Sequence, residues 1–289
     1  MPELPEVETI VRSLRPHIVG HTITGVAIRF PDVLRTPAAE LTREIDGRRV
    51  ESVDRRGKNV VVRLSESGVL ALNLGMTGRL LAFPEPPAGF HIPIHATVTF
   101  ELHGGTLLVF DDVRRFGTVE WLTEADWADR AGRMGPEPFD RRFTARALSS
   151  RLGRSRAPIR SWLLDQKRIA GIGNIYANEA LYLAGIDPRR PAHGIIPDEA
   201  RRLHRALRRV LREAIRAGGT TLRDYRTAEG KEGRYGPSLA VYGRAGAPCI
   251  RCGTRVERTV FSGRSAFFCP KCQPTEPTTQ KEPGGERHG

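Results

Sequence analysis

The chain lacks any run of about 18 consecutive apolar residues, the minimum length of a helix that crosses a bilayer. Its N-terminus also lacks the basic leader and apolar core that mark secreted proteins. We therefore expect no membrane partner and a cytoplasmic location, in which thiols stay reduced. At 289 residues the chain is long enough for two domains, each with its own core.

The chain has too few acidic residues to balance the positive charge of its basic residues. The 46 Lys and Arg residues outnumber 33 Asp and Glu residues, which leaves a formal charge of +13 and a pI near 10.4. A surplus of this size favours a polyanionic partner, nucleic acid before an anionic membrane. The alternative is a GC-rich genome that favours arginine codons, but the charge is spread unevenly along the chain.

Cysteine is absent before residue 249, and all four cysteines then fall within 24 residues. They form two CxxC pairs, Cys249–Cys252 and Cys269–Cys272, with 16 residues between the pairs. Clustering in a reducing compartment argues against disulfides, and this spacing is typical of a tetrahedral zinc ion bound by four thiolates. Four thiolates leave no open coordination position, so the sequence predicts a structural zinc ion. An iron–sulfur cluster is the alternative.

The residues between the cysteine pairs, GTRVERTVFSGRSAFF, contain two apolar runs on either side of Ser262-Gly263. This pattern predicts a β-hairpin that turns at these two residues. The cysteine-bearing segment also carries four arginines: Arg251, Arg255, Arg258 and Arg264. A zinc ion would hold this basic hairpin rigid and present its arginines to phosphate groups.

Short β-like runs dominate the first part of the chain, and helical periodicity replaces them after about residue 145. Apolar residues at helical spacing predict a helix over residues 4–18. Seven expected strands follow, at residues 22–28, 49–55, 59–64, 69–74, 96–102, 106–110 and 118–122. Their number and spacing predict a β-sandwich or barrel. Further helices are expected at residues 145–152, 159–164, 175–184 and 200–217, the last of which carries seven arginines.

Three motifs point to nucleic acid, each with a simpler alternative. Gly171-Ile-Gly-Asn174 precedes an expected helix, where backbone N–H groups can meet a phosphate, although a capping turn looks the same. Phe116, in DVRRFG, either folds into the core or acts as an exposed wedge that replaces a flipped base. Met76, between glycines in LGMTG, is a second candidate wedge or a core residue.

Six segments together resemble formamidopyrimidine-DNA glycosylase of the Fpg/Nei family, bacterial repair enzymes that excise 8-oxoguanine and ring-opened purines. They are PELPEVET, LGMTGRL, DVRRFG, GIGNIYANEAL, GGTTLRDY and the hairpin that ends in FFCPKCQ. They span residues 2 to about 273 in the family's order. The resemblance implies an α+β multidomain fold: an N-terminal β-sandwich with flanking helices, then a helix–two-turn–helix domain with a four-Cys zinc-finger β-hairpin.

The resemblance also implies domain boundaries, a partner and a cofactor. The expected domains are a catalytic β-sandwich (2–134), a linker (135–148), the helix–two-turn–helix domain (149–228), the end of a lesion-recognition loop with a connector (229–244), the zinc finger (245–273) and a disordered tail (274–289). The partner would be damaged double-stranded DNA, and the cofactor one structural zinc ion. We expect a monomer in the bacterial cytoplasm, associated with the nucleoid.

The resemblance assigns the chemistry to the first residues. Removal of Met1 would leave Pro2 with a free secondary amine, whose ordinary pKa of about 7.7–8.0 leaves part of it neutral. Pro2 would attack the sugar C1′ and form a Schiff base with the DNA. Glu3 would donate a proton to the sugar oxygen during this attack. Lys58 would donate for β-elimination, and Arg264 would donate for δ-elimination and hold a phosphate.

The remaining DNA contacts follow from motif positions. Met76, Arg114 and Phe116 would fill the gap left by the flipped base, and backbone amides of residues 220–225 would recognise 8-oxoguanine. The full set of expected DNA-binding residues is Glu6, Asn73, Met76, Arg114, Arg115, Phe116, Asn174, Thr220, Thr221 and Tyr242. Two positions depart from the family: Asn73 replaces a common histidine, and Arg160 replaces a common lysine, which changes the geometry of the donor.

Two other functions are weighed against this one. An endonuclease VIII-type glycosylase removes oxidised pyrimidines and shares Pro2, Glu3 and the zinc hairpin, but Leu4, Met76 and Phe116 favour the purine enzyme. A non-catalytic DNA-binding protein with a zinc module would not need the Pro2–Glu3 pair. The sequence therefore predicts a bifunctional glycosylase and AP lyase of base excision repair.

Overall fold

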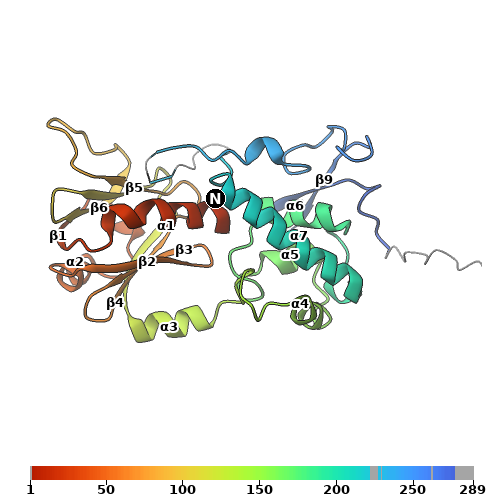
Figure 1. Cartoon of the computed structure of the whole chain (residues 1–289), viewed down its shortest axis with the longest axis horizontal. Coiled ribbons are helices and arrows are strands. Elements are labelled where there is room, and N and C mark those ends of the chain that lie inside the picture. The colour runs from red at the N-terminus through yellow and green to blue at the C-terminus, as the bar shows by residue number, and fades with distance from the viewer. Residues whose placement is uncertain (1, 222–226, 229, 262, 277–289) are drawn as a thin grey trace, which may run out of the picture. The chain divides into compact units, whose positions relative to one another are not determined.

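The computed structural model describes residues 2–221, 227–228, 230–261 and 263–276 (Figure 1). The chain divides into two compact units, each built from three stretches. The first unit holds Met1–Arg141, Leu163–Gly173 and Arg208–Leu239, and the second holds Arg142–Trp162, Asn174–Leu207 and Ala240–Gly289. Most of the expected disordered tail, from residue 277 onward, lies outside the described residues.

Two antiparallel sheets form the first unit, each with four strands among the described residues (Figure 1). One sheet contains, in order, β1 (Ile23–Ile28), β6 (Ala96–Leu102), β7 (Leu107–Asp111) and β5 (Arg79–Phe83). The other contains β2 (Val50–Arg56), β3 (Asn59–Leu64), β4 (Gly68–Asn73) and β8 (Thr118–Thr123). Side chains from both sheets share one hydrophobic core, so the unit is a β-sandwich.

The alternation of side chains along β3 explains its nearly continuous apolar run. Val60 and Val62 point into the shared core, whereas Val61 packs on the outer face with Trp127. Trp127 belongs to α3 (Glu124–Gly132), which begins after the N-cap Thr123. Helix α2 (Ala38–Ile45) contributes its buried Leu41 and Ile45 to the shared core.

Helix α1 (Leu4–Ile18) packs against strands of both sheets, namely β2, β3 and β5. Its buried apolar residues recur at three- and four-residue spacing, so one face of the helix enters the sandwich core. A helix held along its whole length by this core keeps the N-terminal residues in a defined place. The expected helix at residues 4–18 is confirmed.

The second unit is helical and carries the cysteine hairpin. It holds α4 (Ala145–Leu152), most of α5 (Ile159–Leu164), α6 (Asn174–Ala184) and the first part of α7 (Pro197–Arg216), whose residues from Arg208 onward belong to the first unit. The hairpin consists of β9 (Glu257–Phe261) and β10 (Arg264–Phe268), and β10 packs against α6. One short 3-10 helix, η2 (Ala192–Gly194), lies in this unit, whereas η1 (Pro31–Val33) and η3 (Gly236–Ser238) lie in the first unit. The expected α+β architecture is confirmed.

A buried ion pair holds the start of α7 in the second unit. Arg190 donates to both carboxylate oxygens of Glu199, at 2.5 and 2.8 Å, and both side chains are buried. The second oxygen of Glu199 also accepts the backbone N–H of Ile196 just ahead of the helix. No helix in the described part of the chain combines the length and apolar character that crossing a bilayer requires.

Candidate functional site

The N-terminal residues form a buried capping box at the start of α1. The backbone N–H of Glu3 donates to Glu6 Oε2 at 2.8 Å, and the backbone N–H of Glu6 donates to the Glu3 side chain. Both glutamates are buried, as is Pro2. Carboxylates in the first turn are stabilised by the positive end of the helix dipole. Local sequence therefore fixes the residues that were expected to carry the chemistry.

The glycines of the GIGN motif lie closer to the N-terminal residues than a side chain at these positions would allow. The N–H of Leu4 donates to the Gly171 carbonyl at 3.0 Å, and Gly171 has a φ of +86°. A Cβ at Gly173 would lie 2.5 Å from Glu3 Oε1. Gln166 holds this loop by accepting the Gly171 N–H and donating to the Ile172 carbonyl, both at 2.8 Å. The glycines therefore fit the loop around Leu4 and Glu3.

Glu6 also contacts the segment that follows α7. Its Oε1 accepts the backbone N–H of the buried Thr220 at 2.8 Å. Thr221 Oγ1 accepts the backbone N–H of Gly233 at 2.8 Å. Residues 222–226, which include most of the backbone amides expected to recognise 8-oxoguanine, lie outside the described residues. Of the backbone amides that were expected to recognise 8-oxoguanine, that of Thr220 already donates its N–H to Glu6.

The far end of that segment is anchored in the sandwich. Ala228 is buried in the shared core, its carbonyl accepts the N–H of Ala82 on β5, and its N–H donates to Ser13 Oγ on α1. Sequence reasoning missed Ala228 and Ser13, because neither carries chemistry or a local pattern. Both ends of the segment are therefore tied to the unit that holds Pro2.

Lys58 lies in the two-residue turn between β2 and β3. Glu137 holds this turn: it accepts the backbone N–H of Gly57 at 2.7 Å and pairs with Arg55 and Arg56 at 2.6 and 3.1 Å. A Cβ at Gly57 would lie 3.8 Å from the nitrogen of Gly171, so the turn packs beside the glycine loop. Sequence reasoning missed Glu137.

Met76, Arg114 and Phe116 come together from two loops of the first unit. Phe116 is 57% exposed and Met76 is 43% exposed, so the alternative that these side chains belong to the core is wrong. The Arg114 guanidinium lies 4.5 Å from the centre of the Phe116 ring, and Arg114 Nη1 lies 3.5 Å from Met76 Sδ. The three side chains form one exposed group, and its insertion in place of a flipped base stays a prediction.

A buried aspartate holds the two loops that carry this group. Asp112 accepts the Thr77 hydroxyl at 2.5 Å with one oxygen and the backbone N–H of Gly117 at 2.8 Å with the other. The backbone N–H of Arg114 donates to Thr77 Oγ1 at 3.1 Å. A Cβ at Gly75, which has a φ of +55°, would lie 2.5 Å from the backbone of Phe116. The backbones therefore touch where only glycine fits.

Asn73 and Arg115 have different surroundings from the exposed group. The Asn73 amide donates to Asn59 Oδ1 and accepts the N–H of Gly75, both at 3.0 Å, so it holds the start of the Met76 loop. Arg115 pairs with Asp32 at 3.3 Å and lies over the Phe30 ring. A phosphate contact by either residue stays a prediction.

In the second unit, Arg160 links Asn174 to the cysteine hairpin. Its Nη2 donates to Asn174 Oδ1 at 2.6 Å and to the Ser265 carbonyl at 2.8 Å. Arg160 is buried, and its Nε has no hydrogen-bond partner among the described residues. Burial, and then the charge of the exposed Arg264 at the start of β10, lowers the pKa of Arg160. Asn174 and Arg264 thus belong to one basic cluster.

Tyr242 is held against this hairpin by Glu179. The Glu179 carboxylate accepts three backbone N–H groups, those of Ala240, Val241 and Tyr242. Burial raises the pKa of Glu179, and these three bonds oppose the shift. The Tyr242 ring meets the Phe267 ring edge-on at 5.2 Å. Glu179 is thus a buried residue that positions Tyr242, and sequence reasoning missed it.

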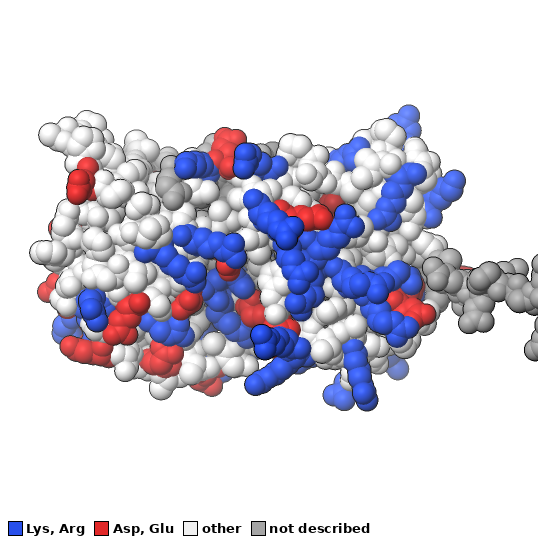
Figure 2. Space-filling model, in the orientation of Figure 1, with Lys and Arg blue, Asp and Glu red and all other residues white. Residues whose placement is uncertain are grey.

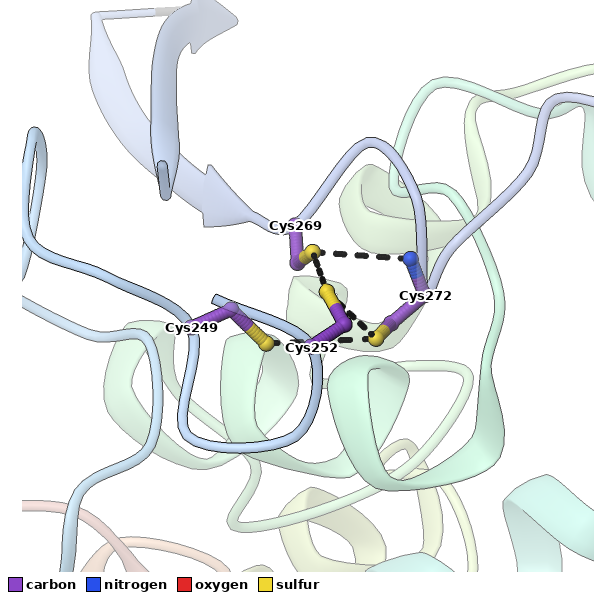
Figure 3. A group of neighbouring side chains, drawn as sticks. All are labelled: Cys249, Cys252, Cys269 and Cys272. Atoms are coloured by element: carbon purple, nitrogen blue, oxygen red, sulfur yellow. Dashed lines mark hydrogen bonds between the residues drawn. The ribbon is translucent and has the colours of Figure 1, made fainter. Parts of the chain in front are cut away.

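The four cysteines converge as expected (Figure 3). Their sulfur atoms all lie within 4.8 Å of one another, with Cys249 to Cys272 at 3.8 Å and Cys252 to Cys269 at 3.5 Å. Tetrahedral zinc with Zn–S bonds of about 2.3 Å requires sulfurs about 3.8 Å apart, so the residues fit the ion. Burial would raise the pKa of Cys249, but hydrogen bonds led by that from Tyr182 lower it to about 6, which favours the thiolate.

Comparison with known protein families covers most of the chain. Residues 1–119 match the formamidopyrimidine-DNA glycosylase N-terminal domain, and residues 134–226 match the H2TH domain of the same enzymes. Residues 246–275 match a zinc finger found in FPG and IleRS. Together with the sulfur geometry, this match shows a site for one structural zinc ion.

Individual relatives are similar over nearly their whole length. The formamidopyrimidine-DNA glycosylase of Chloroflexus aggregans is 45% identical, over 94% of this chain and 98% of that protein. The one from Paracoccus denitrificans is 44% identical, over 94% and 100%. The solved MutM (Fpg) protein from Thermus thermophilus is 43% identical with a TM-score of 0.84, over 96% and 100%. Lactococcus lactis Fpg, solved in complex with DNA containing an abasic site, is 31% identical with a TM-score of 0.87, over 94% and 99%.

Proposed function

Because the chain belongs to the formamidopyrimidine-DNA glycosylase family, we propose that it removes oxidised purines from duplex DNA and then cleaves the abasic site. It is a DNA glycosylase of base excision repair with one structural zinc ion. The lyase step and the residue roles below are our proposal. The observation that carries them is the buried capping box that holds Glu3 beside Pro2.

Excision begins at the secondary amine of Pro2, once Met1 has been removed. The nitrogen attacks C1′, the bond from C1′ to the damaged base breaks, and the electron pair leaves with the base, which takes up the proton that the Pro2 amine loses. Glu3 protonates the sugar ring oxygen, the ring opens, and the product is an iminium between Pro2 and C1′. The Glu3–Glu6 bond supports this role, because it limits the motion of the residue that carries the proton.

Strand cleavage follows from the iminium, which makes the C2′ protons acidic. Loss of one C2′ proton expels the 3′ phosphate, and a second elimination expels the 5′ phosphate. We assign Lys58 to the first elimination and Arg264 to the second, where each donates a proton or holds the departing phosphate. Position supports these assignments: the Lys58 turn packs beside Gly171, and Arg264 is exposed beside Asn174 and Arg160.

The exposed group of Met76, Arg114 and Phe116 would enter the duplex where the damaged nucleotide leaves it. Arg114 carries donors for the orphaned cytosine, and Phe116 offers an apolar edge to stack between bases. The preformed contacts of Arg114 with Phe116 and Met76 support this proposal, since little ordering is left to do on binding.

The endonuclease VIII alternative is not favoured, because the relatives that match over nearly the full chain are formamidopyrimidine-DNA glycosylases. Single-turnover excision on three matched duplexes, with 8-oxoguanine, a formamidopyrimidine or an oxidised pyrimidine, tests the substrate class. We expect the two purine lesions to be excised faster than the pyrimidine by at least about tenfold. Faster excision of the pyrimidine would restore the alternative.

A further inference from the structure

A cavity of about 480 Å³ opens on the first unit, and none of the residues that line it is assigned above to DNA or catalysis. Its walls come from α1, from β2, from Phe139 and from the last turns of α7. Its volume lies within the range of about 300–1,000 Å³ that is usual for ligand pockets. In Figure 2 the blue Lys and Arg side chains gather along the line that α7 takes in Figure 1.

The cavity has an apolar floor made by Phe139 and Ile215, both half-buried. Two arginines from successive turns of α7, Arg208 and Arg212, each place the guanidinium carbon 5.7 Å from the centre of the Phe139 ring. A cation at this distance from an aromatic face is attracted to it. The ring therefore helps to hold these charges at the edge of the floor.

The positively charged side chains around the cavity outnumber the acidic side chains that could neutralise them. Among the described residues, Glu8 is the one acidic residue that lines it, and Glu8 is already paired with Arg12 at 2.8 Å and Arg55 at 3.2 Å. Arg212 and Arg216 form no ion pair within the described part of the chain. Two guanidiniums without acidic partners thus stand beside an apolar floor.

We propose that this cavity is a docking site for an acidic peptide segment of a partner protein, which inserts an aromatic or long aliphatic side chain. Carboxylates of the segment would pair with Arg212 and Arg216, and the apolar side chain would lie on Phe139 and Ile215. Double-stranded DNA fits less well, because its bases stay stacked inside the duplex and its phosphates would leave the apolar floor empty.

The test uses the full zinc-loaded protein and a fluorescein-labelled peptide with three aspartates followed by isoleucine and tryptophan. Fluorescence anisotropy should show saturable binding that weakens at least about tenfold in the double variant Arg212→Ala, Arg216→Ala. The matched control, Arg205→Ala with Arg209→Ala, removes the same charge from the same helix outside the cavity and should stay within about twofold. Excision of 8-oxoguanine should be unchanged in both variants.

A second arm tests the apolar floor and the rival occupant. Replacing the tryptophan of the peptide by glycine, or Phe139 by alanine, should weaken binding at least about fivefold. Equal losses in the two double variants would overturn the proposal, as would no binding at about 1 mM peptide. Loss of affinity for undamaged duplex DNA in the Arg212, Arg216 variant, with no loss for the peptide, would instead identify a nucleic-acid surface.

Discussion

The carboxylate of Glu6 accepts the backbone N–H of Thr220, a residue 214 positions later in the chain, at 2.8 Å. Its other oxygen accepts the backbone N–H of Glu3 at the same distance. One buried side chain therefore joins the N-terminal residues to the start of the segment after α7. In our account this bond keeps the amine of Pro2 in place while the lesion is recognised a short way along the same segment.

Glu6→Gln should weaken both ends of this link. A glutamine has one acceptor oxygen, so one of the two backbone N–H groups loses its partner in a buried place, at a cost of about 1–3 kcal/mol. We expect a matching loss in the free energy of unfolding, measured by urea denaturation, and slower Schiff-base formation. Glu51→Gln, on the exposed face of β2, is the control and should change neither quantity. If the two variants behave alike, Glu6 does not organise the site.

Gly173→Ala should damage catalysis more than folding. The added Cβ would lie 2.5 Å from Glu3 Oε1, so Glu3 must move, while the sandwich core is untouched. We expect single-turnover excision to slow by at least about tenfold, with zinc content and the circular dichroism spectrum unchanged. Gly132→Ala is the matched control, because a Cβ there meets nothing within 4 Å. Normal excision by the Gly173 variant would argue against Glu3 as the proton donor.

Phe116→Ala and Arg114→Ala should affect duplex substrates selectively. Both side chains are exposed, so we expect little change in the free energy of unfolding. Excision from an 8-oxoguanine duplex should fall, whereas cleavage of a single-stranded abasic site, which needs no flipping, should persist. Val113→Ala, at an exposed neighbour in the same loop, should cleave both substrates normally. Equal losses on both substrates would show that the group acts on the chemistry instead.

Removal of zinc should abolish DNA binding and leave the first unit folded. The four cysteines hold the hairpin that carries Arg264 and Ser265, but they contribute nothing to the sandwich core. After chelation, hydrogen exchange should still protect the amides of β3 and β4, while those of β9 and β10 exchange quickly. Affinity for lesion DNA, measured in parallel, should be lost. Unchanged affinity in the chelated protein would remove the hairpin from the DNA interface.

Much of the fold could be predicted where a local pattern determines an element. Helix α1 was expected over the residues it occupies, because its apolar spacing is regular. The β9–β10 hairpin followed from two apolar runs between cysteine pairs, although Ser262 of its turn lies outside the described residues. Strand β5 was missed, since it is five residues long and sits between a glycine loop and a proline-rich loop.

The missed helices have similar causes. Helix α2 is only eight residues long and has no side-chain cap at its start, so the sequence pattern gives little indication of a helix there. Helix α3 was not expected either, because Gly132 and the prolines that follow obscure the end of the helix. The packing of Trp127 against Val61 stabilises α3. It is a tertiary contact that no local sequence pattern predicts.

The parts of the site that could not be predicted are long-range hydrogen bonds. Glu137 holds the Lys58 turn from 80 residues away, and Thr77 and Asp112 hold the two loops of the exposed group. These residues carry no catalytic chemistry of their own, and a single sequence shows no periodicity for such pairs. The residue types of the site were therefore visible in the sequence, but the side chains that position them were not.

The measurement that tests the central claim most directly is borohydride trapping on an 8-oxoguanine duplex. Reduction of the iminium between Pro2 and C1′ should give a stable covalent adduct, and peptide mapping by mass spectrometry should place the DNA fragment on the N-terminal proline. A chain whose N-terminal tag keeps Pro2 in a peptide bond is the control and should give no adduct. No adduct with the processed chain, or an equal yield from the tagged chain, would contradict the mechanism.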